Sequence, residues 1–229
     1  MTRLISIIMP ALDEAASIAS VIASVPVDKF TSRGLDVEIL VVDNGSKDGT
    51  GHLARKAGAR VVHEPRRGYG QAYLRGFKEA KGDIICTMDA DGTYPASVLP
   101  DMVEVLLREN LDFINTNRFT LMTNGVMPKI NKVGNAILNL TGQALFRLPF
   151  RDSQSGMWIF RARLLEKMNL QATDMALSQE IKIEAAYRLK ARCAELPVHY
   201  GYRSGTPKLR PWHDGVGNLL SLFRKRLCW

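Results

Sequence analysis

The first half of the chain alternates short apolar runs with amphipathic stretches. The apolar runs are rich in β-branched residues and occur in LISIIMP, VEILVVD, ARVVHEP and DIICTMD. Between them, residues 18–25, 52–57 and 71–80 have the spacing of amphipathic helices. Short buried runs separated by helical segments predict an α/β fold, in which a mostly parallel sheet is covered by helices.

The second half has fewer strand patterns and longer helical ones. Residues 101–109 predict a helix, LDFINTNRF a strand that ends near Arg118, SGMWIFRARLLEKM a strand that runs into a helix, and residues 177–189 another helix. Two further segments, one that opens at Pro128 and one over residues 214–229, carry apolar residues on one helical face and basic residues beside it. Such helices can dock on the core or lie in a membrane interface.

Composition narrows the class of protein. A chain of 229 residues with 46% hydrophobic residues is expected to form a single domain over residues 1–229. The net charge of +8 favours an anionic partner such as a nucleotide, a phospholipid surface or a nucleic acid. No window approaches the roughly 18 consecutive apolar residues of a membrane-spanning helix, so we expect any membrane contact to be peripheral. Three dispersed cysteines predict a reducing compartment.

Acidic residues follow the predicted strands. Asp43 ends VEILVVD, Asp89 and Asp91 follow DIICTM, and a turn with Asp13 and Glu14 follows the first strand. Ligands of parallel sheets bind at the carboxyl ends of the strands. In ICTMDADGTYP, the two carboxylates suit either a phosphatase nucleophile with its partner acid or a clamp for a metal and a diphosphate.

The segment RRGYGQAYLRG has glycines at a strand-to-helix junction. Gly68 and Gly70 are placed as in a dinucleotide fingerprint, but Tyr73 stands where that fingerprint needs a third glycine. A basic, flexible approach to an anionic ligand through Arg66 and Arg67, with backbone amides at the helix start, is the better interpretation.

The phosphatase interpretation rests on TMDADGT, which resembles the first motif of haloacid-dehalogenase-type phosphatases. That family needs a later acidic pair after a glycine to hold Mg²⁺, and the chain beyond Asp91 has no such pair. The interpretation also leaves the first third of the chain without a role, so it is the weaker alternative.

Four ordered stretches resemble a family of glycosyltransferases. SIIMPALDEAASI, ILVVDNGSKDGT, GYGQAYLRGFKEAKGDIICTMDADGTYP and DSQSGMWIFRARLLE together are similar to the inverting family-2 glycosyltransferases of GT-A fold, in particular the polyprenyl-phosphate enzymes of the dolichyl-phosphate mannose synthase type. The resemblance implies metal-dependent, inverting transfer of a hexose from a UDP- or GDP-sugar to a polyprenyl phosphate. It assigns residues 1–118 to the nucleotide sugar and residues 119–229 to the acceptor.

The resemblance also implies the donor site. Asp89 and Asp91 would hold Mg²⁺ or Mn²⁺, with Asp91 the main ligand. The positions expected to bind the nucleotide sugar are Pro10, Leu12, Glu14, Asp43, Gly70, Asp89 and Asp91. This chain has Leu12-Asp13-Glu14 where relatives often have Tyr-Asn-Glu, a departure at the expected base-binding position.

A lipid phosphate acceptor is already an anion and needs cations rather than a general base. The resemblance places Asp152 and Ser155 in the sugar pocket and has Gln179 and Glu180 face the donor sugar. Glu180 would be the base if the acceptor were a glycan or small-molecule hydroxyl, the main alternative. Asp91, Arg203 and Glu180 are the expected catalytic residues. The candidate acceptor cations are Arg118, Lys129, Lys132, Arg203 and Lys208. We therefore expect a cytoplasmic enzyme, peripheral on the cytoplasmic membrane face, that binds no nucleic acid.

Overall fold

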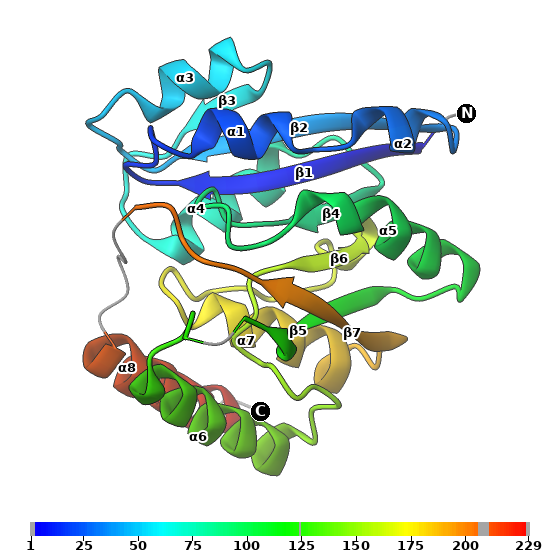
Figure 1. Cartoon of the computed structure of the whole chain (residues 1–229). Helices are drawn as coiled ribbons and strands as arrows, with labels where there is room; N and C mark the ends of the chain where they lie inside the picture. The colour runs from blue at the N-terminus through cyan, green and yellow to red at the C-terminus, as the bar shows by residue number, and fades with distance from the viewer. Residues whose placement is uncertain (1–2, 124, 206–210, 228–229) are drawn as a thin grey trace.

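The computed structural model describes residues 3–123, 125–205 and 211–227 and contains one seven-stranded sheet (Figure 1). The strand order is β3-β2-β1-β4-β6-β5-β7, and β6 alone among these strands runs antiparallel to its neighbours. The expected α/β fold with a mostly parallel sheet is confirmed. The strands are β1 (Arg3–Ala11), β2 (Leu35–Asp43), β3 (Arg60–His63), β4 (Ile84–Thr87), β5 (Phe113–Met122), β6 (Trp158–Arg161) and β7 (Cys193–Tyr200).

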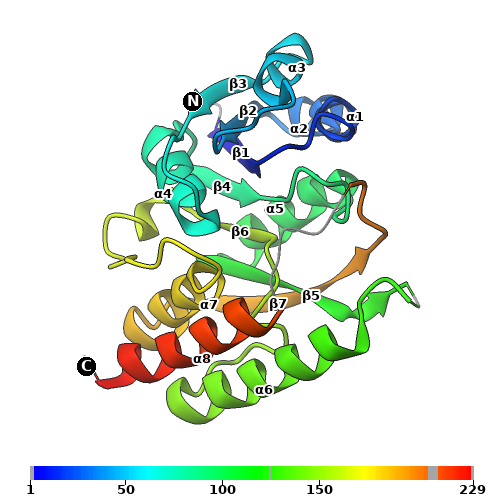
Figure 2. The same cartoon turned by 90° about the vertical axis from the view of Figure 1, so that its left-hand side faces the viewer.

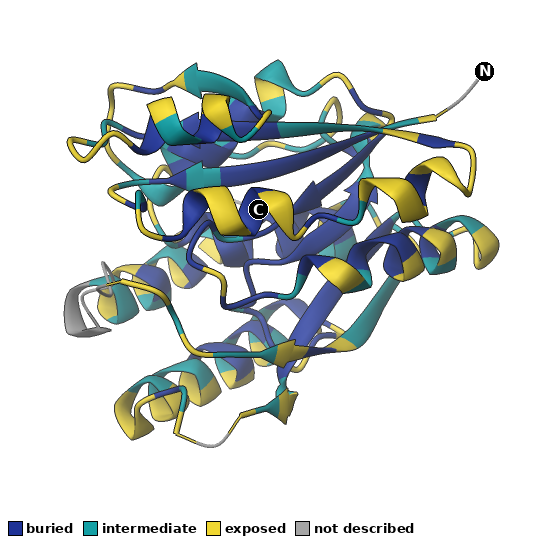
Figure 3. Ribbon diagram, turned by 45° about the horizontal axis from the view of Figure 1, so that its top comes forward, coloured by how far each residue is buried: buried dark blue, intermediate teal, exposed yellow. Residues whose placement is uncertain are grey.

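Helices cover both faces of the sheet. Side chains of one strand alternate between two core clusters, so that Ile7 of β1 packs in one cluster and Ile8 in the other. Burial on both faces explains why the central strands are continuous apolar runs, and Figure 3 shows the buried sheet between helices that are exposed on their outer sides. The helices are α1 (Ile18–Ala23), α2 (Val27–Thr31), α3 (Thr50–Lys56), α4 (Tyr69–Glu79), α5 (Leu99–Arg108), α6 (Lys129–Phe146), α7 (Leu177–Lys182) and α8 (Pro211–Leu227).

Several elements differ from the sequence-based expectation. Strand β7 and helix α2 were not predicted, and β7 has Pro197 within it, which an edge strand tolerates because one side of its backbone is unpaired. The expected helix after β6 is a single 3₁₀ turn, η2 (Ala162–Leu164). The backbone beyond it is instead held by Glu180 and Glu184, whose carboxylates accept hydrogen bonds from the amides of residues 169, 171 and 172.

The predicted helix over residues 177–189 is divided in two. Helix α7 ends at Lys182 and continues as a π-helix, η3 (Ile183–Arg188). A π-helix is rare and often lies beside a functional site, since its extra residue rotates the side chains that follow.

Helices α6 and α8 form an outer pair. They lie side by side below β5, β7 and α7 (Figures 1 and 2). Each helix buries a narrow apolar stripe, with Leu138 and Phe146 of α6 and Leu222 of α8 in the core. Within the described residues, no helix has both the length and the apolar character needed to span a bilayer.

Candidate active site

The carboxyl ends of β1, β2 and β4 meet at one edge of the sheet. Ala11 at the end of β1 pairs with Asp43 at the end of β2, and β4 lies on the other side of β1. The turn that carries Asp89 and Asp91 follows β4 directly. The parallel topology therefore brings the acidic strand ends to the same edge, as expected.

Asp91 is buried and fully engaged by neighbouring groups. Its Oδ1 accepts hydrogen bonds from the backbone amide of Thr93 at 2.9 Å and from the Thr93 hydroxyl at 2.7 Å. Its Oδ2 lies 2.7 Å from Nη2 of Arg203. The amide of Ser204 donates to the carbonyl oxygen of Asp91 at 2.9 Å, and the amide of Gly201 donates to that of Thr93 at 3.0 Å. These hydrogen bonds attach residues 201–205 to the turn that carries Asp91.

Asp89 differs from Asp91 because its carboxylate has no hydrogen-bond donor among the described residues. Burial, together with the neighbouring charge of Asp91, raises the pKa of Asp89 to about 7 against the opposing charges of Arg203 and Arg118. Asp89 and Asp91 stand one residue apart in the sequence, and in the described part of the chain one of them has no hydrogen-bond donor. Their carboxylates offer the hard oxygen ligands that Mg²⁺ and Mn²⁺ prefer. The described residues contain no group of three or more acidic, histidine or cysteine side chains placed to hold a metal. The remaining ligands would have to come from a diphosphate.

Residues 152–156 form the wall opposite this turn. The hydroxyl of Ser155 lies 2.6 Å from the hydroxyl of Thr116 and 3.2 Å from the hydroxyl of Tyr94. The Tyr94 hydroxyl also accepts a hydrogen bond of 2.8 Å from the backbone amide of Gly156. A Cβ on Gly156 would lie 2.8 Å from the hydroxyl of Tyr69 and 3.4 Å from Oδ1 of Asp89. Glycine is therefore required here, because the backbone approaches the metal-ligand candidate closely.

Arg118 and Asp152 form a buried, bidentate ion pair. Nε and Nη2 of Arg118 each lie 2.8 Å from an oxygen of Asp152, and the amide of Arg118 donates to the same carboxylate at 3.0 Å. Burial raises the pKa of Asp152, but the charge and hydrogen bonds of Arg118 lower it further, to below its usual value. Arg118 therefore already has a carboxylate partner, and its role as an acceptor cation stays a prediction.

The predicted nucleotide positions lie around the ends of β1 and β2. Pro10 and Leu12 are half-buried, and Glu14 is buried, with the hydroxyl of Ser17 at 3.3 Å from its carboxylate. Oδ1 of Asp43 accepts the amide of Ser46 at 2.9 Å. The structure thus groups these side chains at the expected edge of the sheet.

Two predicted positions make packing contacts. A Cβ on Gly70 would lie 2.4 Å from the carbonyl oxygen of Ala172, so this glycine lets α4 pack on another backbone segment rather than open toward a ligand. Oε2 of Glu180 accepts the amides of Gln171 and Ala172 at 2.9 and 2.8 Å, and Oε1 lies 2.7 Å from Nζ of Lys225. Both oxygens of Glu180 thus contact α8 and residues 171–172, and its orientation toward the sugar as a possible base stays a prediction.

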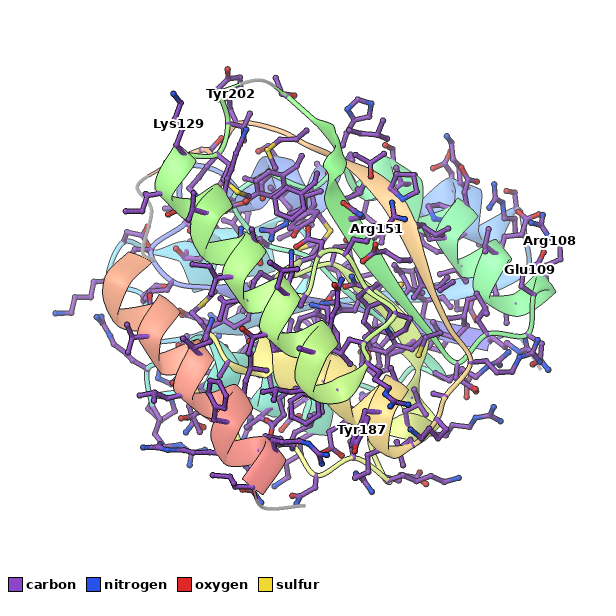
Figure 4. All side chains as sticks on the ribbon, turned by 90° about the horizontal axis from the view of Figure 1, so that it is seen from below. Arg108, Glu109, Lys129, Arg151, Tyr187 and Tyr202 are labelled. Atoms are coloured by element: carbon purple, nitrogen blue, oxygen red, sulfur yellow. The ribbon has the colours of Figure 1, made fainter. Side chains whose placement is uncertain are left out.

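The other predicted cations lie toward α6. Lys129 and Lys132 are exposed at the start of this helix, and Lys129 lies at the same end of it as the exposed Tyr202 (Figure 4). Tyr202 is adjacent to Arg203 in the sequence, so Lys129 and Lys132 lie beside segment 201–205, which is hydrogen-bonded to the Asp91 turn. Lys208 lies outside the described residues.

Sequence reasoning missed several polar residues that organise the site. The side-chain amide of Asn44 donates to the carbonyls of Glu64 and Arg66, which fixes the loop before α4 to the end of β2. Lys182 is completely buried below residues 152–156. Its signal in the sequence was a lysine between two isoleucines. The amide nitrogen of Gln179, predicted to face the sugar, lies 3.1 Å from the Ser153 hydroxyl in the same wall.

Comparison with known proteins identifies related chains. The profile described as "Glycosyl transferase family 2" matches residues 6–168. A Haloferax volcanii protein named dolichyl-phosphate hexose transferase is 31% identical over 212 residues, which cover 93% of this chain and 89% of the relative. A Pyrococcus furiosus protein named dolichol-phosphate mannosyltransferase is 28% identical over 217 residues, which cover 90% of this chain and 59% of the relative.

A similar solved structure is glucosyl-3-phosphoglycerate synthase from Mycobacterium tuberculosis in complex with Mn²⁺, uridine diphosphate and phosphoglyceric acid. The TM-score is 0.74 at 25% identity, and the match covers 96% of this chain and 78% of that one. The expected GT-A architecture is confirmed by this match.

Proposed function

Since the chain belongs to glycosyl transferase family 2 and is a hexosyltransferase, we propose that it moves a hexose from a UDP- or GDP-sugar to a polyprenyl phosphate. The names of the Haloferax and Pyrococcus relatives support a lipid-phosphate acceptor. Membership of this family removes the phosphatase alternative for Asp89 and Asp91. The proposal divides the chain as the sequence suggested, with the nucleotide sugar on residues 1–118 and the acceptor on residues 119–229.

The observation that carries the proposal is the Asp89–Asp91 pair with Arg203 at 2.7 Å from Asp91. We propose that Asp89 and Asp91 hold Mg²⁺ or Mn²⁺ against the donor diphosphate, since the Mycobacterium tuberculosis enzyme was solved with Mn²⁺ and uridine diphosphate. The bound cation would neutralise the charge that develops on the leaving diphosphate. Arg203 supports the same charge from the other side, because its guanidinium can turn from the carboxylate to a phosphate oxygen.

Transfer needs no general base when the acceptor is a phosphate. An anionic oxygen of the lipid phosphate attacks the anomeric carbon as the bond between that carbon and the diphosphate oxygen breaks. The electron pair leaves with the nucleoside diphosphate, and the configuration at the anomeric carbon is inverted. The engagement of Glu180 by Lys225 is compatible with this scheme, which asks nothing of that carboxylate.

We propose that the acceptor phosphate enters between Arg203 and the start of α6. Lys129 and Lys132 are exposed there, and Lys208 belongs to the same proposal from the sequence. Arg118 contributes through its pair with Asp152, which fixes the wall of the sugar pocket rather than offering a free charge.

The outer faces of α6 and α8 support a peripheral membrane contact. Both helices expose large apolar side chains in a row, with exposed fractions as high as 66% for Leu140 and 86% for Leu227. Lysine and arginine residues flank this surface, as in helices that lie in an anionic membrane interface. We propose that it rests on the cytoplasmic membrane face. The exposed apolar residues are Ile130, Val133, Ile137, Leu140, Val216, Leu220, Phe223 and Leu227.

The test is incubation of the purified chain with Mn²⁺, radiolabelled nucleotide sugars and a polyprenyl phosphate. We expect label to enter the organic phase for one donor, and Asp91→Asn to serve as the inactive control. Absence of an extractable product with every donor would refute the acceptor assignment.

A second candidate is transfer to the hydroxyl of a small molecule or glycan. The phosphoglyceric acid held by the Mycobacterium tuberculosis enzyme is the observation that favours it. A hydroxyl needs a base, so Glu180→Gln would then reduce turnover far more than Arg203→Ala. The lipid-phosphate proposal predicts the reverse order.

A further inference from the structure

Lys182 is a buried cation below the wall of the site. Its side chain has no exposed surface, and Nζ donates to the carbonyl oxygens of Ser153 at 2.7 Å, Ser155 at 2.8 Å and Ser178 at 2.9 Å. Nζ also lies 5.2 Å from the ring centre of Trp158. Two of its three carbonyl acceptors belong to residues 152–156, so Lys182 supports this segment from beneath, together with Trp158 and Ser178, which also donate to the Ser155 carbonyl.

The three acceptors define the protonation state that the site requires. A neutral amine has two N–H groups, whereas an ammonium has three, and three carbonyl oxygens surround Nζ. Burial lowers the pKa of Lys182 well below its usual value; the charge of Asp152 opposes this effect, the charge of Arg118 adds to it, and Glu195 makes a smaller opposing contribution. Asp152 also pairs with Arg118, and the Asp152 amide donates to the half-buried Glu195 carboxylate, so Lys182 lies beside an ion pair rather than in a purely apolar environment.

The segment held by Lys182 leads directly to the metal-ligand candidate. The carbonyl oxygen of Ser155 accepts a hydrogen bond from Lys182, and its hydroxyl is within hydrogen-bond distance of those of Thr116 and Tyr94. The next residue, Gly156, approaches Asp89 closely enough that a Cβ would lie 3.4 Å from its carboxylate. A shift of Ser155 would therefore move the backbone that faces the reacting end of the donor.

We propose that Lys182 is a positioning residue for glycosyl transfer, and that it fixes residues 152–156 beside Asp89 so that the donor sugar is held in its reactive orientation. The inference rests on the proposed function. Lys182 acts through the carbonyls of Ser153 and Ser155 and does not itself contact the donor.

Lysine suits this position because its stem is apolar and its end carries three donors. Methionine has nearly the same length and would fill the space, but it would remove the hydrogen bond to the buried carbonyl oxygen of Ser153 and one of the three hydrogen bonds to that of Ser155, which keeps Trp158 Nε1 and the Ser178 hydroxyl as donors. Unpaired buried carbonyls move toward water or another donor. The wall would then shift while the ends of β1, β2 and β4 stay in place.

The experiment compares Lys182→Met with the exposed control Lys78→Met in two assays. The first is calorimetric binding of a nucleoside diphosphate with Mn²⁺, which contacts the strand ends and not the wall. The second is transfer from the complete nucleotide sugar, analysed as separate kcat and KM values. We expect Lys182→Met to bind the diphosphate within about twofold of the wild type and to lose about 100-fold in kcat, the effect of misplacing reacting groups by about 1 Å. Lys78→Met should match the wild type in both.

Lys182→Ala gives an independent readout. It leaves room for a small alkylammonium ion, and added propylammonium should restore part of kcat in this variant and none in Lys182→Met. A kcat of Lys182→Met within about fivefold of wild type would overturn the proposal. So would equal losses of diphosphate binding and kcat, or variants that do not fold, because each would make Lys182 a general stability residue. Failure of the proposed function is distinct, since the wild type itself would then show no transfer.

Discussion

Replacing Arg118 with methionine tests whether the buried Arg118–Asp152 pair is a single structural unit. The substitution keeps the length of the side chain and removes two hydrogen bonds of 2.8 Å, which leaves the Asp152 carboxylate buried without its main partner. Removing one partner of such a pair costs about 3–5 kcal/mol. Lys182 remains nearby and reduces the imbalance, so we expect about 3 kcal/mol, or a fall in Tm of about 6–12 °C for a chain of this size.

The pH dependence follows from the sign of the pKa shift. In the wild type the pKa of Asp152 is lowered, because the charge of Arg118 outweighs burial. The stabilisation by the pair is therefore complete above the unfolded pKa of about 3.9 and is lost as the pH falls below it. Without Arg118, burial dominates and raises the pKa of Asp152, so the variant is destabilised further as the pH rises. The stability difference between the two proteins should widen from pH 5 to pH 8.

The assay is urea unfolding followed by circular dichroism, with Arg118→Met, Asp152→Leu and the double variant compared at both pH values. Replacement of both partners by apolar residues removes the unpaired charge, so the double variant should be more stable than Arg118→Met alone. Additive losses, or a difference that does not change with pH, would refute the description of the pair as a coupled buried unit.

Three further predictions concern the site and the outer helices. Asp91→Asn should reduce turnover by about 100-fold or more and abolish Mn²⁺-dependent binding of a nucleoside diphosphate in calorimetry, and binding near the wild-type value would exclude Asp91 as the metal ligand. Gly156→Ala should destabilise the protein by about 1–3 kcal/mol in urea unfolding because its Cβ meets the hydroxyl of Tyr69, and adding Tyr69→Phe should recover part of this loss; no recovery would place the clash elsewhere. Glutamate at both Val133 and Leu140 should weaken sedimentation with anionic vesicles by about tenfold, while turnover on a short, water-soluble isoprenyl phosphate stays unchanged; undiminished sedimentation would contradict membrane contact through α6.

The strand ends could be predicted from the sequence because their signals are local. Apolar runs that end in Asp43 or in the Asp89–Asp91 turn have the same consequence in any parallel sheet, since its topology gathers the carboxyl ends. The predicted sheet and its acidic edge are both present in the structure.

The second half was less predictable because its contacts are distant along the chain. Asp152 and Arg118 are 34 residues apart and satisfy each other, which no local pattern indicates. The ion pair of Glu180 could not be foreseen, because its partner Lys225 lies 45 residues away. Strand β7 escaped prediction because Pro197 and its mixed polarity are tolerated at a sheet edge.

The contact between Arg203 and Asp91 has a consequence for how ligands influence one another. A cation that takes Oδ2 of Asp91 releases the guanidinium for an anion, and an anion that takes the guanidinium releases the carboxylate for a cation. By thermodynamic linkage, each ligand must then raise the affinity for the other by the same factor. Titrations of a nucleoside diphosphate with and without Mg²⁺, in the wild type and in Arg203→Ala, would measure how much of that cooperativity this one exchange of partners provides.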